Sequence, residues 1–158
     1  MRKLSFLIVA AGLYLVPAAA HAGFGVEASL GYGLELKPDV QTAGYNAMVA
    51  VGYGVLGKML RAELGFVGAK NTTSPTSVTQ LELRPMVVFD PPFLPFYLRG
   101  VGAFDHTDAG WHTAWGGFAG VGGSLFGLGI FGEVGALPQF VSGQTFWIGE
   151  ARLGAYYF

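Results

Sequence analysis

The residues of this chain that could do chemistry are a small set of acids and bases spaced two positions apart. Charged residues make up 12% of the sequence, against about 25% in ordinary soluble domains. A spacing of two places side chains on one face of a β-strand. Such a set can form Arg–carboxylate pairs, line a polar path, or supply paired carboxylates for acid–base catalysis. Its members are Glu27, Arg61, Glu63, Glu82, Arg84, Arg99, Glu133, Glu150 and Arg152.

A second group lies between Asp105 and His112 and also contains His106 and Asp108. Imidazole and carboxylate together can bind a divalent metal. The spacing matches no known metal motif, and polar residues are ordinary in an exposed loop. We therefore predict no metal site, no cofactor and no catalytic residue in this segment.

The elements that must position these residues are strands. Phe24–Leu36 alternates apolar residues with Gly, Ser and Glu, and a period of two is typical of a strand. Similar patterns predict eight strands in total, although the sixth is too rich in glycine for its two faces to be assigned and Pro85 interrupts the fourth. The eight predicted strands are Phe24–Leu36, Tyr45–Gly54, Met59–Gly68, Val78–Phe89, Phe96–Phe104, Ala114–Gly123, Leu128–Ala136 and Phe146–Phe158.

The connectors between these strands alternate between polar segments and tight turns. Short periplasmic turns and longer external loops are the layout of outer-membrane barrels, which predicts that both termini are periplasmic. The four expected external loops are residues 37–44, 69–77, 105–113 and 137–145.

Composition favours a membrane barrel over other classes. Glycine contributes 26 of 158 residues, and no run beyond the N-terminus reaches the ~18 apolar residues of a membrane helix. A soluble lipocalin-like barrel would need a charged exterior, for which this chain has too few charges. We predict an all-β fold, an eight-stranded antiparallel up-and-down transmembrane β-barrel.

The N-terminus has the pattern of a secretory signal. Arg2 and Lys3 precede the apolar run Leu4–Val16, and Ala20-His21-Ala22 matches a cleavage site. This predicts a signal peptide over 1–22 and one barrel domain over 23–158. The chain has no cysteine, and loss of Arg2 and Lys3 changes its net charge from −1 to −3. Nucleic acid is therefore not an expected partner.

Aromatic residues gather near both ends of the predicted strands, where membrane–water interfaces select them. The aromatics expected at the interfaces are Tyr32, Tyr45, Phe96, Trp115, Trp147, Tyr157 and Phe158.

The strand pattern and the terminal Phe158 resemble those of the small eight-stranded bacterial outer-membrane barrels, such as the OmpA transmembrane domain and the opacity proteins. The resemblance implies residence in outer-membrane lipid and recognition of the last strand by the barrel-assembly machinery. In that family the terminal aromatic and alternate residues before it face lipid. Here that would expose Glu150 and Arg152 to lipid, which costs ~2–4 kcal/mol for an Arg near the midplane. We expect both in the lumen, with a change of facing near Gly154 or a frayed end.

These expectations favour one function over two others. Eight strands enclose only enough room for side chains, so the charges should pair and plug the lumen. This predicts a structural or surface-interaction protein with a possible ligand at its external loops. A narrow channel, or a lateral path for small solutes as in OmpW-like barrels, is the first alternative, although no apolar trough is expected in the lumen.

A lipid-A-modifying barrel enzyme is the second alternative. Similar deacylases have a Ser two residues after a His. Asp108 and Ala114 occupy that position after His106 and His112, so an enzyme is not expected. Three serines of the predicted external loops remain as possible nucleophiles: Ser74, Ser77 and Ser142.

Overall fold

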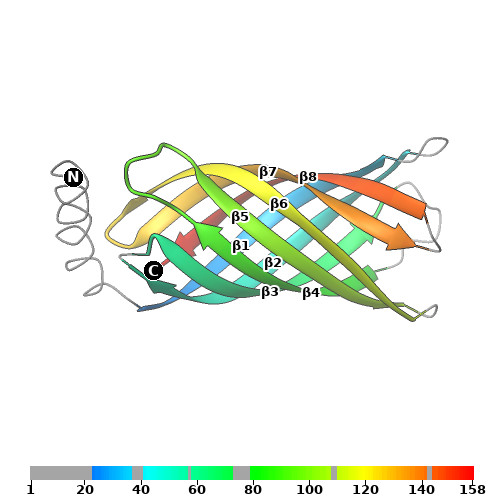
Figure 1. The fold of residues 1–158 in the computed structure, drawn as a ribbon, viewed down its shortest axis with the longest axis horizontal. Coiled ribbons are helices and arrows are strands. Elements are labelled where there is room, and N and C mark those ends of the chain that lie inside the picture. Colours follow the sequence, from blue (N-terminus) through cyan, green and yellow to red (C-terminus); the bar gives the residue numbers. More distant parts are fainter. Residues whose placement is uncertain (1–22, 37–40, 57, 73–78, 108–109, 142–143) are drawn as a thin grey trace, which may run out of the picture.

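Eight antiparallel strands form a closed barrel in this computed structural model (Figure 1). The structure describes residues 23–36, 41–56, 58–72, 79–107, 110–141 and 144–158; the expected signal peptide lies outside them. The strands are β1 (Gly23–Leu36), β2 (Gln41–Val55), β3 (Leu60–Asn71), β4 (Thr79–Phe89), β5 (Tyr97–Thr107), β6 (Gly110–Leu125), β7 (Leu128–Val141) and β8 (Gln144–Tyr157). Each strand pairs with the next, and β8 pairs with β1. The predicted eight-stranded up-and-down barrel is confirmed.

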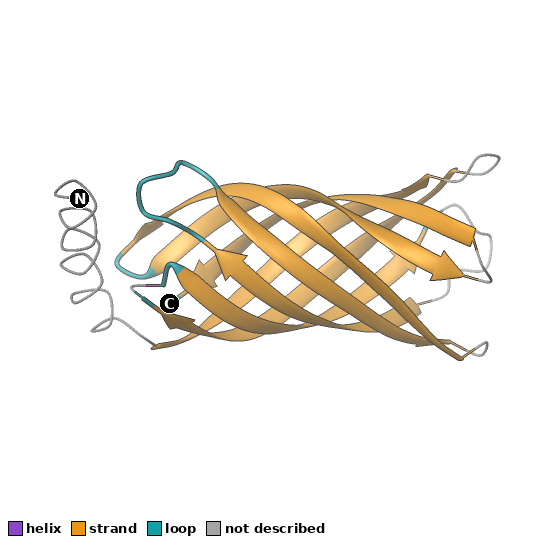
Figure 2. Cartoon of the chain, viewed as in Figure 1, coloured by secondary structure: helices purple, strands orange, loops and turns teal. Residues whose placement is uncertain are grey.

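Both ends of the described chain lie at one end of the barrel, which we call the terminal mouth. The turns β2–β3, β4–β5 and β6–β7 also lie there, and the opposite end is the far mouth. Figure 2 shows that strands make up almost the whole described chain. Among the described residues no helix is long and apolar enough to cross a membrane.

The outer wall of the barrel is apolar. Leu30, Ile130 and Leu153 are each 70–73% exposed, while the residues between the outward positions point inside. An apolar surface of this extent cannot face water without promoting association. The alternation therefore builds a barrel with an apolar outside and a separate interior.

The facing of β6, which its glycine content hides in the sequence, is set by its two neighbours. Phe118 is 3% exposed and points into the barrel, while Trp115 is 57% exposed on the outer wall. The inner face of β6 therefore carries Ala114, Phe118 and the glycines between and beyond them.

The expected change of facing in β8 is wrong. The strand pairs with β1 without interruption from Tyr157, opposite Val26, to Trp147, opposite Leu36. Glu150 and Arg152 thus share the inner face with the residues that follow them, Gly154, Tyr156 and Phe158. Continuous pairing on both edges holds the strand in one register, so its facing cannot switch.

Phe158 is consequently not an aromatic residue of the outer wall. A Cβ built on Gly25 would lie 2.3 Å from the Phe158 ring, so the ring occupies the space that this glycine leaves inside the barrel. The Arg61 guanidinium carbon is 5.2 Å from the ring centroid, a favourable cation–π distance. Tyr157 is the last residue of β8 that faces outward, and it is 57% exposed.

The four expected long loops are shorter than the sequence suggested, because the strands continue into them. Strand β5 extends to Thr107 and β6 begins at Gly110, and β7 extends to Val141 with β8 beginning at Gln144. The polar residues in these extensions do not prevent pairing, since the backbone forms the ladder. The longest connector of the terminal mouth, 90–96, is longer than either of these hairpin connections.

Prolines interrupt two ladders without shifting their register. Pairing between β4 and β5 is broken around Pro85, and it resumes in the same register at Met86. Pairing between β6 and β7 is broken in the same way around Pro138. A proline lacks the N–H that a ladder requires, so each break falls where a donor is missing and no bulge forms.

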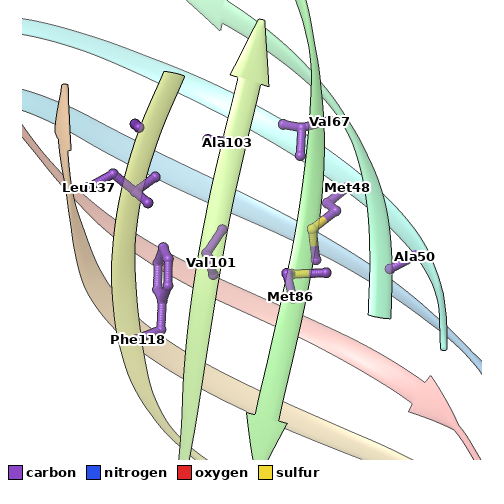
Figure 3. Packing of buried hydrophobic residues seen from close by; sticks show 9 residues of the cluster. Met48, Ala50, Val67, Met86, Val101, Ala103, Phe118 and Leu137 are labelled. Carbon is purple, nitrogen blue, oxygen red and sulfur yellow. The ribbon is translucent and has the colours of Figure 1, made fainter. Parts of the chain in front are cut away.

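One side of the interior is lined by apolar side chains. Nine buried residues from β2 to β7 form this cluster, as Figure 3 shows, and Ile148 of β8 packs against it. They are Met48, Ala50, Val67, Met86, Val101, Ala103, Ala114, Phe118 and Leu137. The side chains of this cluster pack together and against the charged residues. They therefore leave no apolar trough in the described part of the lumen.

Gly116→Ala should destabilise the barrel by about 1–3 kcal/mol, the usual cost of overpacking. A Cβ at Gly116 would lie 2.0 Å from the Ala136 carbonyl oxygen of β7, which is backbone and cannot rotate away. The measurement is the urea midpoint of the refolded protein. Gly123→Ala is the matched control, because a Cβ there meets nothing within 4 Å; equal midpoints for the two variants would contradict the packing described.

Candidate functional site: the charged lumen

Among the described residues, ten charged side chains form one network of ion pairs inside the barrel, and nine of them are the charged residues singled out in the sequence. Eight of these nine are buried, with 2–6% of their surface exposed, and Glu82 is half-buried near the far mouth. They come from six strands: β1, β3, β4, β5, β7 and β8. The tenth is Asp90, which follows β4.

Arg99 is the centre of the group. Its two terminal nitrogens donate to the two carboxylate oxygens of Glu27 at 2.8 and 2.7 Å, a bidentate pair that joins β5 to β1 across the lumen. Glu133 lies 3.2 Å and Glu63 lies 3.6 Å from the same guanidinium. Tyr97 also donates its hydroxyl to Glu133 at 2.8 Å. One cation thus holds three carboxylates from three other strands.

The ion pairs continue from this centre toward the far mouth. Arg152 contacts Glu133 at 3.3 Å and Glu150 at 2.6 Å. Arg84 contacts Glu150 at 3.0 Å and also pairs with Glu82. The chain of charges therefore passes from β7 to β8 and then to β4.

A second branch runs from the centre to the terminal mouth. Arg61 donates to Glu63 at 3.0 Å and to Asp90 at 2.9 Å. The sequence analysis missed Asp90 because the residue lies in a turn, outside the predicted strands. The sequence did contain a signal, because an acid directly follows β4, and β4 ends beside β3, the strand that carries Arg61.

Asn46 is a further contributor that the sequence analysis did not single out. Its amide donates to Glu150 at 2.8 Å. This bond adds β2 to the strands that the charges connect. The network contains four guanidinium groups and six carboxylates, a formal balance of −2.

Aromatic rings cover the cations where carboxylates do not. The Arg152 guanidinium lies 4.3 Å from the Phe118 ring centroid, and that of Arg99 lies 5.4 Å from the Phe131 centroid. Both distances suit cation–π contact. The rings separate the charged groups from the rest of the interior and leave them little access to water.

Inward glycines make room for these long side chains. A Cβ on Gly52 would lie 2.7 Å from Cγ of Glu63. One on Gly154 would lie 2.6 Å from the Phe131 ring and 2.6 Å from the Ala28 carbonyl oxygen. A side chain at either position would displace members of the network or its cover.

Two small cavities flank the network. The cavity at the far mouth measures about 140 Å³ and is lined by Asn46, Gln80, Glu82 and Asp105 among others. The cavity at the terminal mouth measures about 70 Å³ and includes Asp90 in its lining. The ion pairs and the apolar cluster occupy the space between them.

The strand alternation separates the histidines of the 105–112 segment. His112 faces Asp105 on the inner side, with Nδ1 3.7 Å from the carboxylate. His106 packs edge-on against Trp111, with ring centroids 5.1 Å apart. Among the described residues no group of three or more His, Asp or Glu could hold a metal ion. Asp108, Ser74, Ser77 and Ser142 lie outside the described residues.

The remaining predicted aromatics lie on the outer wall near its two ends. Tyr32 and Tyr45 pair across β1 and β2, with ring centroids 5.2 Å apart. The exposed fractions of these aromatics lie between 41% and 61% for Tyr32, Tyr45, Phe96, Trp115, Trp147 and Tyr157.

Comparisons with known proteins agree with the architecture. No protein-family model matches the chain, and no curated protein matches it in sequence. The crystal structure of Neisserial surface protein A (NspA) is similar, with a TM-score of 0.60 and 15% identity. The match covers 86% of this chain and 97% of that chain. At this identity the likeness concerns the fold, which is that of an eight-stranded outer-membrane-type barrel.

Arg99→Met should destabilise the barrel by about 3–5 kcal/mol, because three buried carboxylates lose their shared cation. The measurement is the urea midpoint in detergent, with folding checked by heat-modifiable migration on a gel. Glu82→Gln is the control at the half-buried end of the network. Arg84 still pairs with Glu150 in this variant, so the free energy of unfolding should fall by less than about 1 kcal/mol. Similar losses for both variants would argue against Arg99 as the centre.

Proposed function

We propose that this chain is an integral outer-membrane β-barrel protein whose lumen is plugged by Glu/Arg pairs, with a structural or surface-interaction role and no catalysis. The observation that carries the proposal is the unbroken series of ion pairs from Asp90 to Glu82 through Arg99. Such a series pairs the buried charges with one another and occupies the space through which an ion would have to pass.

The outer wall supports the membrane location. Exposed apolar side chains surround the barrel, and aromatic pairs lie near both of its ends. The energetics favour lipid, since burying such a wall yields roughly 25 cal/mol for each Å² removed from water. The likeness to NspA, a protein described as a surface protein, supports the same location.

The proposal places the terminal mouth in the periplasm and the far mouth outside the cell. The barrel-assembly machinery would then read β8, and a surface ligand would bind at the far mouth. The cavity there opens into the interior, and polar side chains such as Asn46, Gln80, Glu82 and Asp105 contribute to its lining.

A narrow channel is the second candidate, favoured by the cavities at both mouths. It would require the Arg99 and Arg152 pairs to open and connect those cavities. A lateral path would require an opening through the wall, where the ladders have only two short breaks at Pro85 and Pro138. A lipid-modifying enzyme would need a nucleophile close to His106 or His112.

Single-channel recording tests the plugged lumen directly. The refolded protein, residues 23–158, should give no conductance steps in a planar bilayer at high salt, because the ion pairs and the apolar cluster fill its interior. The heat-modifiable form of the same sample establishes that it is folded. Reproducible steps that scale with salt concentration would refute the plug and favour the channel.

Cysteine labelling tests the orientation, and the absence of native cysteine makes single-site labelling clean. Thr145→Cys, at the far mouth, should react with a membrane-impermeant maleimide on intact cells. Phe93→Cys, which is at the terminal mouth and replaces a residue that is 77% exposed, should react only after the outer membrane is opened. The reverse pattern would show that the termini are outside.

A further inference from the structure

The outer wall contains a groove that neither the ion-pair network nor the plug explains. It lies over β2, β3 and β4 and reaches β5 and β6, and its volume is about 500 Å³. Its lining is mainly apolar and includes Ala47, Phe66, Gly68, Leu81 and Trp111, with Glu82 and His106 as its polar members. Binding sites for small molecules are concave, mostly apolar and of about 300–1,000 Å³.

The strand register explains why the groove forms at this place. Ala47 pairs with Gly68, and Gly68 pairs with Leu81, so two small residues stand side by side on the outer face. In the adjacent row, Val49 pairs with Phe66. Large side chains therefore surround a floor made of two residues with almost no side-chain atoms. A Cβ on Gly68 would meet nothing within 4 Å, so the space above it is open.

A cation stands just beyond this groove, on the side toward the far mouth. Lys70 lies two residues beyond Gly68 on the same strand, and it pairs with Tyr45. It is exposed, and it also borders the cavity of the far mouth. Among strand residues whose side chains the structure describes, Lys70 is the one charged side chain on the outer face.

The position of Lys70 suits a phosphate. Tyr45, its cross-strand neighbour, belongs to the aromatic residues that mark the level of lipid headgroups. No salt bridge joins Lys70 to another described residue. A lysine in that place can simply extend its amine into water. The apolar groove beside it, however, fits an acyl chain whose headgroup would reach the lysine.

We propose that this groove binds a phosphorylated lipid of the outer leaflet, with an acyl chain over Gly68 and a phosphate at Lys70. The inference rests on the proposed outer-membrane location. The ligand class follows from the two parts of the site: the apolar lining selects a hydrocarbon chain, and the single cation on the outer face selects an anionic headgroup at one height.

The test is a titration of the refolded barrel, in detergent, with bis-phosphorylated lipid A, followed by native mass spectrometry. Wild-type protein should retain one lipid. Lys70→Gln should bind about fivefold more weakly, and Lys70→Arg should restore binding, because one cation near anionic lipid contributes a factor of this size. Lipid A without phosphates should bind wild type and Lys70→Gln equally.

Filling the groove gives an independent variant. Gly68→Leu should reduce retention at least tenfold, since the leucine side chain would occupy the floor. Gly123→Leu is the matched control, because Gly123 is also an outward-facing strand glycine with open space where a Cβ would lie. This variant should retain the lipid as wild type does.

Equal retention by Gly68→Leu and Gly123→Leu, or by Lys70→Gln and wild type, would overturn the site. These outcomes are separate from a failure of the proposed function. Conductance steps or reversed cysteine labelling would refute the plug or the orientation, whereas loss of the lipid site would leave both intact.

Discussion

The structure depends on one constraint: a charge inside an eight-stranded barrel must be neutralised by another side chain, because little water is available there. Arg99 meets this constraint by holding Glu27 with two hydrogen bonds and by lying beside Glu63 and Glu133. Burying a pair of charges carries a large desolvation cost, and it is sustained only with good geometry and further hydrogen bonds. The ion pairs therefore require the registers of the strands that carry them.

The same constraint governs the two ends of the barrel. At the terminal mouth, Arg61 lies under the Phe158 ring while Lys58 donates to the Phe158 main-chain oxygen. These contacts attach β8 to the β2–β3 turn, beyond its ladders with β1 and β7. At the far mouth the network ends at the half-buried Glu82, where a polar cavity begins. The terminal mouth thus keeps only the smaller of the two cavities, and the far mouth has the larger one.

This division assigns different tasks to the two faces of each strand. The inner face holds the paired charges, and the outer face is mostly apolar, with Lys70 as its one charged side chain among the described strand residues. The proposed plug suits a protein that acts through its surface, since changes inside would disturb many strands together. The far mouth and the outer wall are the places where a partner or a lipid can be contacted without breaking the network.

The sequence by itself determined the fold class, because a period of two, scarce charge and aromatic ends describe a strand-built barrel whatever its details. It also selected the inward charges, since any other facing would expose them to lipid. It could not determine which Arg meets which Glu, or that Asp90 and Asn46 join them, because those contacts depend on register between strands far apart in the chain. The Phe158 side chain shows the same limit: family resemblance placed it outward, whereas continuous pairing of β8 with β1 and β7 turned it into the lumen. Strand periodicity is local and can be read from sequence, but partners across a closed barrel are fixed only when all eight registers are set at once.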